Sequence, residues 1–169
     1  MTDQPIPAAL GADVIGIDHV GVATGDLDAT IAFYRDAFGF VELHREENAE
    51  QQVVEAMLGP AESVPAGWAE GTAPALLQVL APMSDRSTIA RFLDRSGPGL
   101  QQLALRVRDL AAVSARLRDR GLRLLYDLPA AGTAGSKINF VHPKDAGGVL
   151  IELVEPASPG AGPGAHIPD

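Results

Sequence analysis

The chain has 169 residues, of which 46% are hydrophobic and 21% are charged, and these proportions are typical of one globular domain. Its net charge of −9 argues against nucleic-acid binding, which requires a basic surface, and the absence of cysteine excludes disulfides, thiolate metal ligands and a cysteine nucleophile. The first residues read neither as a signal peptide nor as a membrane span. We therefore expect a cytoplasmic protein that binds neither nucleic acid nor membrane.

The two ends of the chain differ in composition from its middle. Residues 1–13 contain two prolines and little periodicity, which predicts an N-terminal arm. Residues 156–169 are rich in Pro, Gly and Ala, which predicts a disordered tail. We expect residues 14–155 to form a single domain.

An internal repeat organises this domain. Residues 19–27 and 102–110 each read as an alternating strand, a short turn and an Asp-Leu pair, with the Asp seven residues after the first position. Asp26 and Asp109 are therefore placed to cap the helices that follow. A second match closes each copy, because residues 75–82 and 149–156 are both apolar strands that are interrupted by a polar residue and end at proline.

The first copy continues from its repeat strand into a helix over residues 27–38, where apolar residues recur at helical spacing up to Gly39. The charged run 44–48 is read as a solvated loop, and residues 52–58 as a strand. The Pro- and Gly-rich residues 59–74 predict a long loop before the closing strand.

The second copy follows a linker over residues 83–99, in which residues 87–93 read as a helix. It then predicts a helix over residues 110–120 and a strand over residues 137–141. Together the elements predict an α+β fold of two tandem βαβββ modules, and their sheets should form one incomplete barrel. The modules would span residues 14–82 and 100–155.

Polar residues occupy equivalent strand positions in the two copies: His19 aligns with Gln102, and Gln78 aligns with Glu152. Taken singly, each is more commonly a surface residue or a satisfied strand residue. If a pseudo-twofold axis relates the modules, however, all of them can converge on that axis. Polar side chains buried together need a common partner, and a metal ion suits imidazole, carboxylate and amide oxygen.

Long runs of the chain, over about residues 15–155, resemble the methylmalonyl-CoA epimerase family of the vicinal oxygen chelate superfamily. The runs are IDHVGVA, FYRDAFGFVELHREENAEQQVVEAML, LQVLAPMSDRSTIARFL, GLQQLALRV and LLYDLPAAGTAGSKINFVHPKDAGGVLIELVE. The resemblance implies an acyl-CoA substrate, a homodimer and a divalent metal (Co, Mn, Ni, Zn or Mg). The implied metal ligands are His19, Gln78, Gln102 and Glu152.

The resemblance also implies that Glu55 and Glu152 are the two catalytic bases of an epimerisation. Glu55 lies in an otherwise apolar strand run, and Asn139 lies near the corresponding place in the second copy. A carboxylate desolvated in such a strand would have a raised pKa that suits proton transfer. The alternative is an outward-facing glutamate on an exposed strand face.

One position departs from the family pattern. Where the family reads Gly-Leu-His-His, this chain reads Gly99-Leu100-Gln101-Gln102. An amide oxygen is a weaker ligand than imidazole for Co, Ni or Zn, so the departure implies weaker metal binding, a preference for Mn or Mg, or loss of the metal.

The sequence is compatible with three functions. They are a methylmalonyl-CoA epimerase, a related isomerase or epimerase acting on another acyl group, and a non-catalytic small-molecule-binding protein. Trp68 in the long loop reads either as a lid over the site or as an anchor of the loop.

Overall fold

The computed structural model describes residues 13–61 and 74–157, so Trp68, most of the N-terminal arm and most of the tail lie outside the described residues. Its elements in chain order are β1 (Val14–Ala23), α2 (Leu27–Phe38), β2 (Phe40–Asn48), β3 (Val53–Pro60), β4 (Leu76–Pro82), α3 (Thr88–Ser96), β5 (Gly99–Val107), α4 (Leu110–Asp119), β6 (Ala130–Ala131), η1 (Thr133–Gly135), β7 (Lys137–Val141), η2 (Pro143–Asp145) and β8 (Ile151–Glu155).

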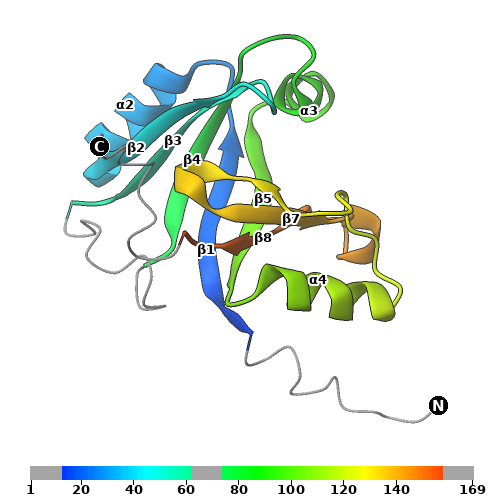
Figure 1. Cartoon of the computed structure of the whole chain (residues 1–169). Helices are drawn as coiled ribbons and strands as arrows, with labels where there is room; N and C mark the ends of the chain where they lie inside the picture. The colour runs from blue at the N-terminus through cyan, green and yellow to red at the C-terminus, as the bar shows by residue number, and fades with distance from the viewer. Residues whose placement is uncertain (1–12, 62–73, 158–169) are drawn as a thin grey trace, which may run out of the picture.

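The strands form one eight-stranded sheet in the order β2-β3-β4-β1-β5-β8-β7-β6. Within each module the first strand pairs in parallel with the last, β1 with β4 and β5 with β8, and the modules join where β1 runs antiparallel to β5. Figure 1 shows the sheet curling around β1, with α2 beside one half and α4 beside the other. The predicted α+β fold of two βαβββ modules forming an incomplete barrel is confirmed.

Each long helix is held by its module in the same way. The side chain of Asp26 accepts a hydrogen bond from the backbone N–H of Ala29, and that of Asp109 accepts one from Ala112, so both predicted caps are confirmed. Each module has a core cluster to which its helix contributes buried residues: Leu27 and Ile31 from α2, Leu110 and Val113 from α4. The concave face between the half-sheets is therefore left free for a site.

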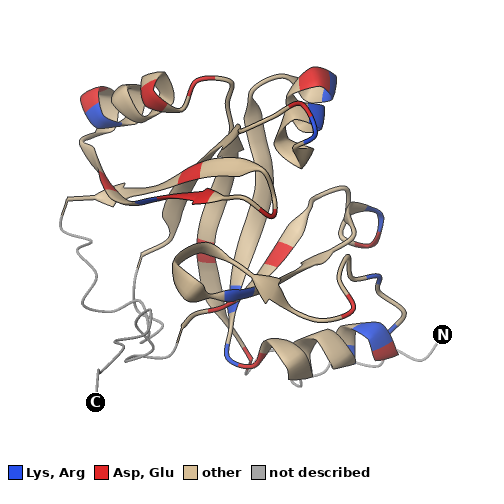
Figure 2. Ribbon diagram, turned by 45° about the horizontal axis from the view of Figure 1, so that its top comes forward, with Lys and Arg blue, Asp and Glu red and all other residues tan. Residues whose placement is uncertain are grey.

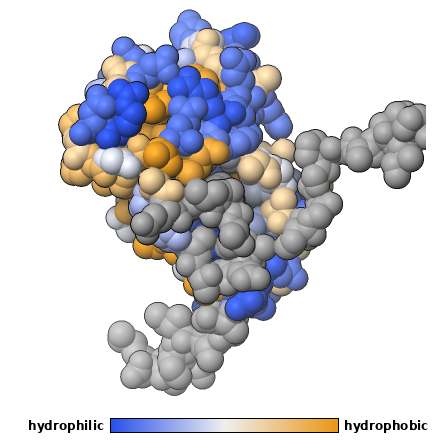
Figure 3. Space-filling model, turned by 90° about the vertical axis from the view of Figure 1, so that its left-hand side faces the viewer, coloured by the Kyte–Doolittle hydropathy of each residue, from blue (hydrophilic) through white to orange (hydrophobic). Residues whose placement is uncertain are grey.

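The prediction of a loop over residues 44–48 is wrong, because these residues belong to β2. Among the described strands β2 lies at the sheet edge and pairs with β3 alone, and charged side chains such as Arg45 and Glu42 are common on such edges because they discourage further strand pairing. The helix α2 exposes two aromatic side chains, Phe33 and Phe38. Figure 3, which views the molecule from the left of Figure 1, shows apolar atoms among polar ones there.

Candidate active site

The four predicted ligand positions lie on the four central strands, β4, β1, β5 and β8, and their side chains meet. The Gln102 amide nitrogen lies 2.5 Å from Glu152 Oε2, 3.1 Å from Gln78 Oε1 and 3.4 Å from His19 Nε2. His19 Nε2 also lies 3.0 Å from Glu152 Oε2. The structure therefore brings these residues together in one polar centre, to which both modules contribute.

Gly21 makes room for this centre. It lies opposite Gln102 in the β1–β5 register, and a Cβ atom on Gly21 would lie 2.6 Å from Gln102 Cγ. The Gln102 side chain can therefore cross β1 only because residue 21 has no side chain. A glycine inside a strand is the sequence signal of such a close approach, and the sequence reasoning missed it.

A chain of two buried ion pairs, His19 with Asp18 and Asp18 with Arg106, holds His19 in place. Asp18 Oδ1 lies 2.9 Å from His19 Nδ1, and Arg106 Nε donates to Asp18 Oδ2 at 2.7 Å. Burial alone would lower the pKa of His19, but the hydrogen bonds with Asp18 and Glu152 outweigh it and raise that pKa to about 9. Asp18 and Arg106 therefore fix the imidazole ring, a role that sequence reasoning did not assign to either residue.

Glu55 lies on β3 and is 4% exposed, so the alternative of an outward-facing glutamate is wrong. Its Oε2 accepts a hydrogen bond from Gln78 Nε2 at 2.9 Å, and its Oε1 accepts one from the Thr133 hydroxyl. Burial raises the pKa of Glu55 to about 7 despite the hydrogen bond from Thr133, which lowers it. Thr133, in η1, is a site residue that the sequence reasoning missed.

Asn139 is not the structural counterpart of Glu55. Met57 lies opposite Gln78 and Phe140 opposite Glu152, so the residue that corresponds to Glu55 is Ile138. Asn139 is one position further and therefore points to the other face of the sheet. There it is fully buried, and its side chain hydrogen-bonds the backbone of Tyr126 and Phe140, which is a structural role.

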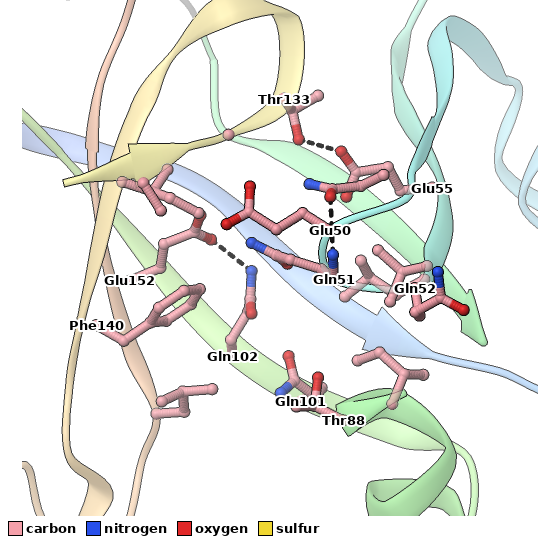
Figure 4. A pocket seen from close by; sticks show the side chains of 18 of the residues that line it. Glu50, Gln51, Gln52, Glu55, Thr88, Gln101, Gln102, Thr133, Phe140 and Glu152 are labelled. Carbon is pink, nitrogen blue, oxygen red and sulfur yellow. Dashed lines mark hydrogen bonds between the residues drawn. The ribbon is translucent and has the colours of Figure 1, made fainter. Parts of the chain in front are cut away.

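The polar centre opens into a cavity of about 410 Å³ between the two half-sheets, a size typical of small-molecule sites. Glu55 and Glu152 both line it, and Figure 4 shows them on opposite sides of the view, with Gln102 reaching toward Glu152. Its apolar lining from the second module is Leu125, Tyr126, Ala130, Ile138, Phe140 and Leu150. The cavity is thus lined both by buried carboxylates and by an apolar wall.

Within residues 13–61 and 74–157, no three His, Cys, Asp or Glu side chains are grouped so that they could hold a metal ion. A metal site at the polar centre would therefore depend on the amides of Gln78 and Gln102 as well as on His19 and Glu152. None of the helices in the described ranges has the length and apolar run needed to span a bilayer.

Comparison with known proteins gives consistent matches. Residues 16–153 match the Glyoxalase/Bleomycin resistance protein/Dioxygenase superfamily. The crystal structure of methylmalonyl-CoA epimerase from Mycobacterium tuberculosis is 49% identical, covers 92% of this chain and 95% of its own, and superposes with a TM-score of 0.77. A methylmalonyl-CoA epimerase in complex with methylmalonyl-CoA and NH4+ is 41% identical over 86% of this chain and 96% of its own, with a TM-score of 0.76.

An ethylmalonyl-CoA/methylmalonyl-CoA epimerase of Cereibacter sphaeroides is 29% identical over 140 residues, which are 81% of this chain and 95% of that relative. The superfamily match over residues 16–153 includes most of both modules and the whole polar centre. The chain belongs to the Glyoxalase/Bleomycin resistance protein/Dioxygenase superfamily and, within it, to the methylmalonyl-CoA epimerase family.

Proposed function

We propose that the protein is an epimerase that interconverts the (R) and (S) forms of methylmalonyl-CoA, or of a close acyl thioester such as ethylmalonyl-CoA. The observation that carries the proposal is a pair of buried carboxylates, Glu55 and Glu152, that line one cavity and are linked through the amides of Gln78 and Gln102. The similar proteins, a methylmalonyl-CoA epimerase bound to methylmalonyl-CoA and an ethylmalonyl-CoA/methylmalonyl-CoA epimerase, support the same substrate class.

Epimerisation removes the proton on the α-carbon from one face and returns a proton on the other face, so it needs one acid/base group on each side. Glu55 comes from the first module and Glu152 from the second, on opposite sides of the cavity. With its pKa raised to about 7, Glu55 can both accept and donate a proton near neutral pH. In one direction Glu55 takes the proton and Glu152 supplies one; in the other direction the roles are exchanged.

Neighbouring side chains hold the two carboxylates in place for this exchange. The hydroxyl of Thr133 and the amide of Gln78 donate to Glu55, and the amide of Gln102 donates to Glu152. Each carboxylate is thereby fixed against the cavity. Such orientation lowers the barrier because the base is already positioned for the proton.

We further propose that His19, Gln78, Gln102 and Glu152 can hold a divalent metal ion. The donor set fits such an ion once the Gln102 carboxamide turns about its last torsion, so that its oxygen replaces the N–H that donates to Glu152 in the metal-free site, because imidazole, carboxylate and amide oxygens are all metal ligands. A bound metal would stabilise the negative charge that develops on the thioester oxygen. Two amides in the set favour Mn or Mg over Co, Ni or Zn.

The two other functions differ from this proposal in what they require of the carboxylates. An epimerase for another acyl group would keep both Glu55 and Glu152 and differ in the apolar wall, whereas a binding protein would need neither as a base. The buried pair of carboxylates favours an enzyme. A cytoplasmic location and a homodimer stay predictions.

The proposal is tested by incubating the protein with methylmalonyl-CoA in heavy water, with and without added Mn²⁺ or Co²⁺. We expect deuterium to replace the α-proton, detected by mass spectrometry, together with racemisation of a single starting epimer. A Glu55→Gln, Glu152→Gln double variant is the matched control and should leave the α-proton in place. No exchange by the wild-type protein under any of these conditions would contradict the proposal.

A further inference from the structure

Glu46 and Glu55 form a pair of like charges on neighbouring strands. In the antiparallel register of β2 with β3, Glu46 lies directly opposite Glu55, so both side chains point to the same face of the sheet. Figure 2 shows acidic positions next to each other on these two strands. Two carboxylates directly opposite each other repel, and the repulsion destabilises the pairing of the strands. A glutamate at position 46 therefore needs a compensating role.

The carboxylate of Glu46 has one partner on its own strand and one in the second module. Its Oε2 lies 2.5 Å from His44 Nε2, two positions earlier on β2. The same oxygen accepts a hydrogen bond from the backbone N–H of Ala134 in η1, at 3.3 Å. Glu46 is partly buried and is not one of the residues that line the cavity. It is therefore placed to hold η1, and not to touch a substrate.

The turn η1 has a strained backbone at the point where Glu46 binds it. Ala134 has a φ of 53°, in the left-handed region that residues with a Cβ atom rarely adopt. Such a conformation persists only where surrounding contacts hold it, and the hydrogen bond to Glu46 is such a contact. The preceding residue, Thr133, donates its hydroxyl to Glu55 Oε1, as Figure 4 shows. The turn thus joins Glu46 on β2 to Glu55 on β3.

We infer that Glu46 is a positioning residue for the catalytic base Glu55, an assignment that rests on the proposed function. Glu46 holds the backbone of Ala134, and the neighbouring hydroxyl of Thr133 then meets the Glu55 carboxylate. Without an acceptor at position 46, η1 is released and the hydroxyl no longer fixes the carboxylate for proton transfer. This role compensates for the repulsion between the two glutamates.

Racemisation kinetics test this inference. Glu46→Ala removes the acceptor and should lower kcat about three- to tenfold, taken at the pH optimum of each protein. The KM of methylmalonyl-CoA should stay unchanged, because Glu46 lies outside the cavity lining. Glu46→Gln keeps an acceptor oxygen and should restore kcat to within about twofold of the wild-type value. Glu47→Ala, at an exposed position on the other face of the same strand, is the matched control and should change neither constant.

A double-mutant cycle separates an action through Thr133 from a general loss of structure. Thr133→Val alone should lower kcat about tenfold, because Glu55 loses a hydrogen bond. Glu46→Ala added to Thr133→Val should lower kcat no further, because Glu46 acts through the hydroxyl that is already gone. Losses that multiply in the double variant would overturn the inference. An equal loss of kcat in Glu46→Gln and Glu46→Ala would also overturn it.

Amide hydrogen exchange of η1 gives a measurement that does not depend on activity. In Glu46→Ala the backbone amides of residues 132–136 should exchange with heavy water about three- to tenfold faster, measured by mass spectrometry. Glu46→Gln and Glu47→Ala should keep the wild-type exchange. Unchanged exchange in Glu46→Ala would overturn the inference. Failure of the proposed function is distinguishable: the wild-type protein would racemise nothing, which overturns both, while η1 would still exchange faster in Glu46→Ala.

Discussion

The two modules have the same strand order, yet at each equivalent pair of site positions they carry different residues. His19 in the first module corresponds to Gln102 in the second, and Gln78 corresponds to Glu152. Glu55 corresponds to the apolar Ile138. Each module therefore supplies one buried carboxylate to the cavity, but from a different strand. The repeat fixes where side chains can reach the cavity, and divergence between the copies makes the cavity asymmetric, as an asymmetric acyl thioester requires.

The largest effect is expected for Glu55→Gln, which removes the buried carboxylate of the first module and keeps the shape of its side chain. We expect racemisation to fall by about 10²- to 10⁴-fold, because one of the two proton-transfer groups is gone. The epimer whose α-proton faces Glu152 should still exchange with heavy water, without inversion. Mass spectrometry of each pure epimer measures this, and circular dichroism checks the fold. Unchanged racemisation would place the base elsewhere.

The raised pKa of Glu55 also predicts a pH profile that the two directions share. Either direction needs one carboxylate ionised and the other protonated, so the active enzyme carries one proton on the pair whichever epimer it binds. Because the pKa of Glu55 is raised to about 7, kcat/KM for both epimers should fall in parallel as the pH rises above about 7 and this proton is lost. The fall should approach about a tenfold change per pH unit. Initial rates from each pure epimer between pH 5.5 and 8.5 test this, and a rate that keeps rising with pH above 7 would contradict it.

The repeat explains why much of the site could be predicted from the sequence. Alternating strands and the Asp-Leu landmarks placed His19 and Gln102 at equivalent positions, and the register of the strands bears this alignment out. The sequence placed Asn139 only near the position that corresponds to Glu55, which is Ile138, because nothing in the run around Asn139 fixes which face each residue takes. Arg106 and Thr133 were missed because each acts through a contact with a residue far away in the sequence. Arg106 contacts Asp18, at a separation of 88 positions, and Thr133 contacts Glu55, at a separation of 78 positions.

Restoring the histidine in the second module would make the polar centre more symmetric. Gln102→His should raise the affinity for Co²⁺ about tenfold, because imidazole is a stronger ligand than an amide for this ion. Calorimetric titration of the wild-type and variant proteins with Co²⁺ and Mn²⁺ measures the effect, and the gain for Mn²⁺ should be smaller. If the wild-type and variant proteins bound Co²⁺ with equal affinity, and likewise Mn²⁺, residue 102 would not face the metal.

The smallest expected effect concerns Gly21. The equivalent position in the second module is occupied by Ala104. In Gly21→Ala the new methyl group would lie 2.6 Å from Gln102 Cγ, so the Gln102 side chain or β1 must shift. We expect the free energy of unfolding to drop by about 1–3 kcal/mol, with a loss of activity from the displaced amide. Gly25→Ala is the matched control, since a Cβ there meets nothing within 4 Å. Denaturant unfolding compares the two variants. Equal free energies of unfolding for the two variants would mean that the Gln102 side chain moves aside at no cost in free energy. The close approach of Gly21 and Gln102 would then not help to hold the polar centre in place.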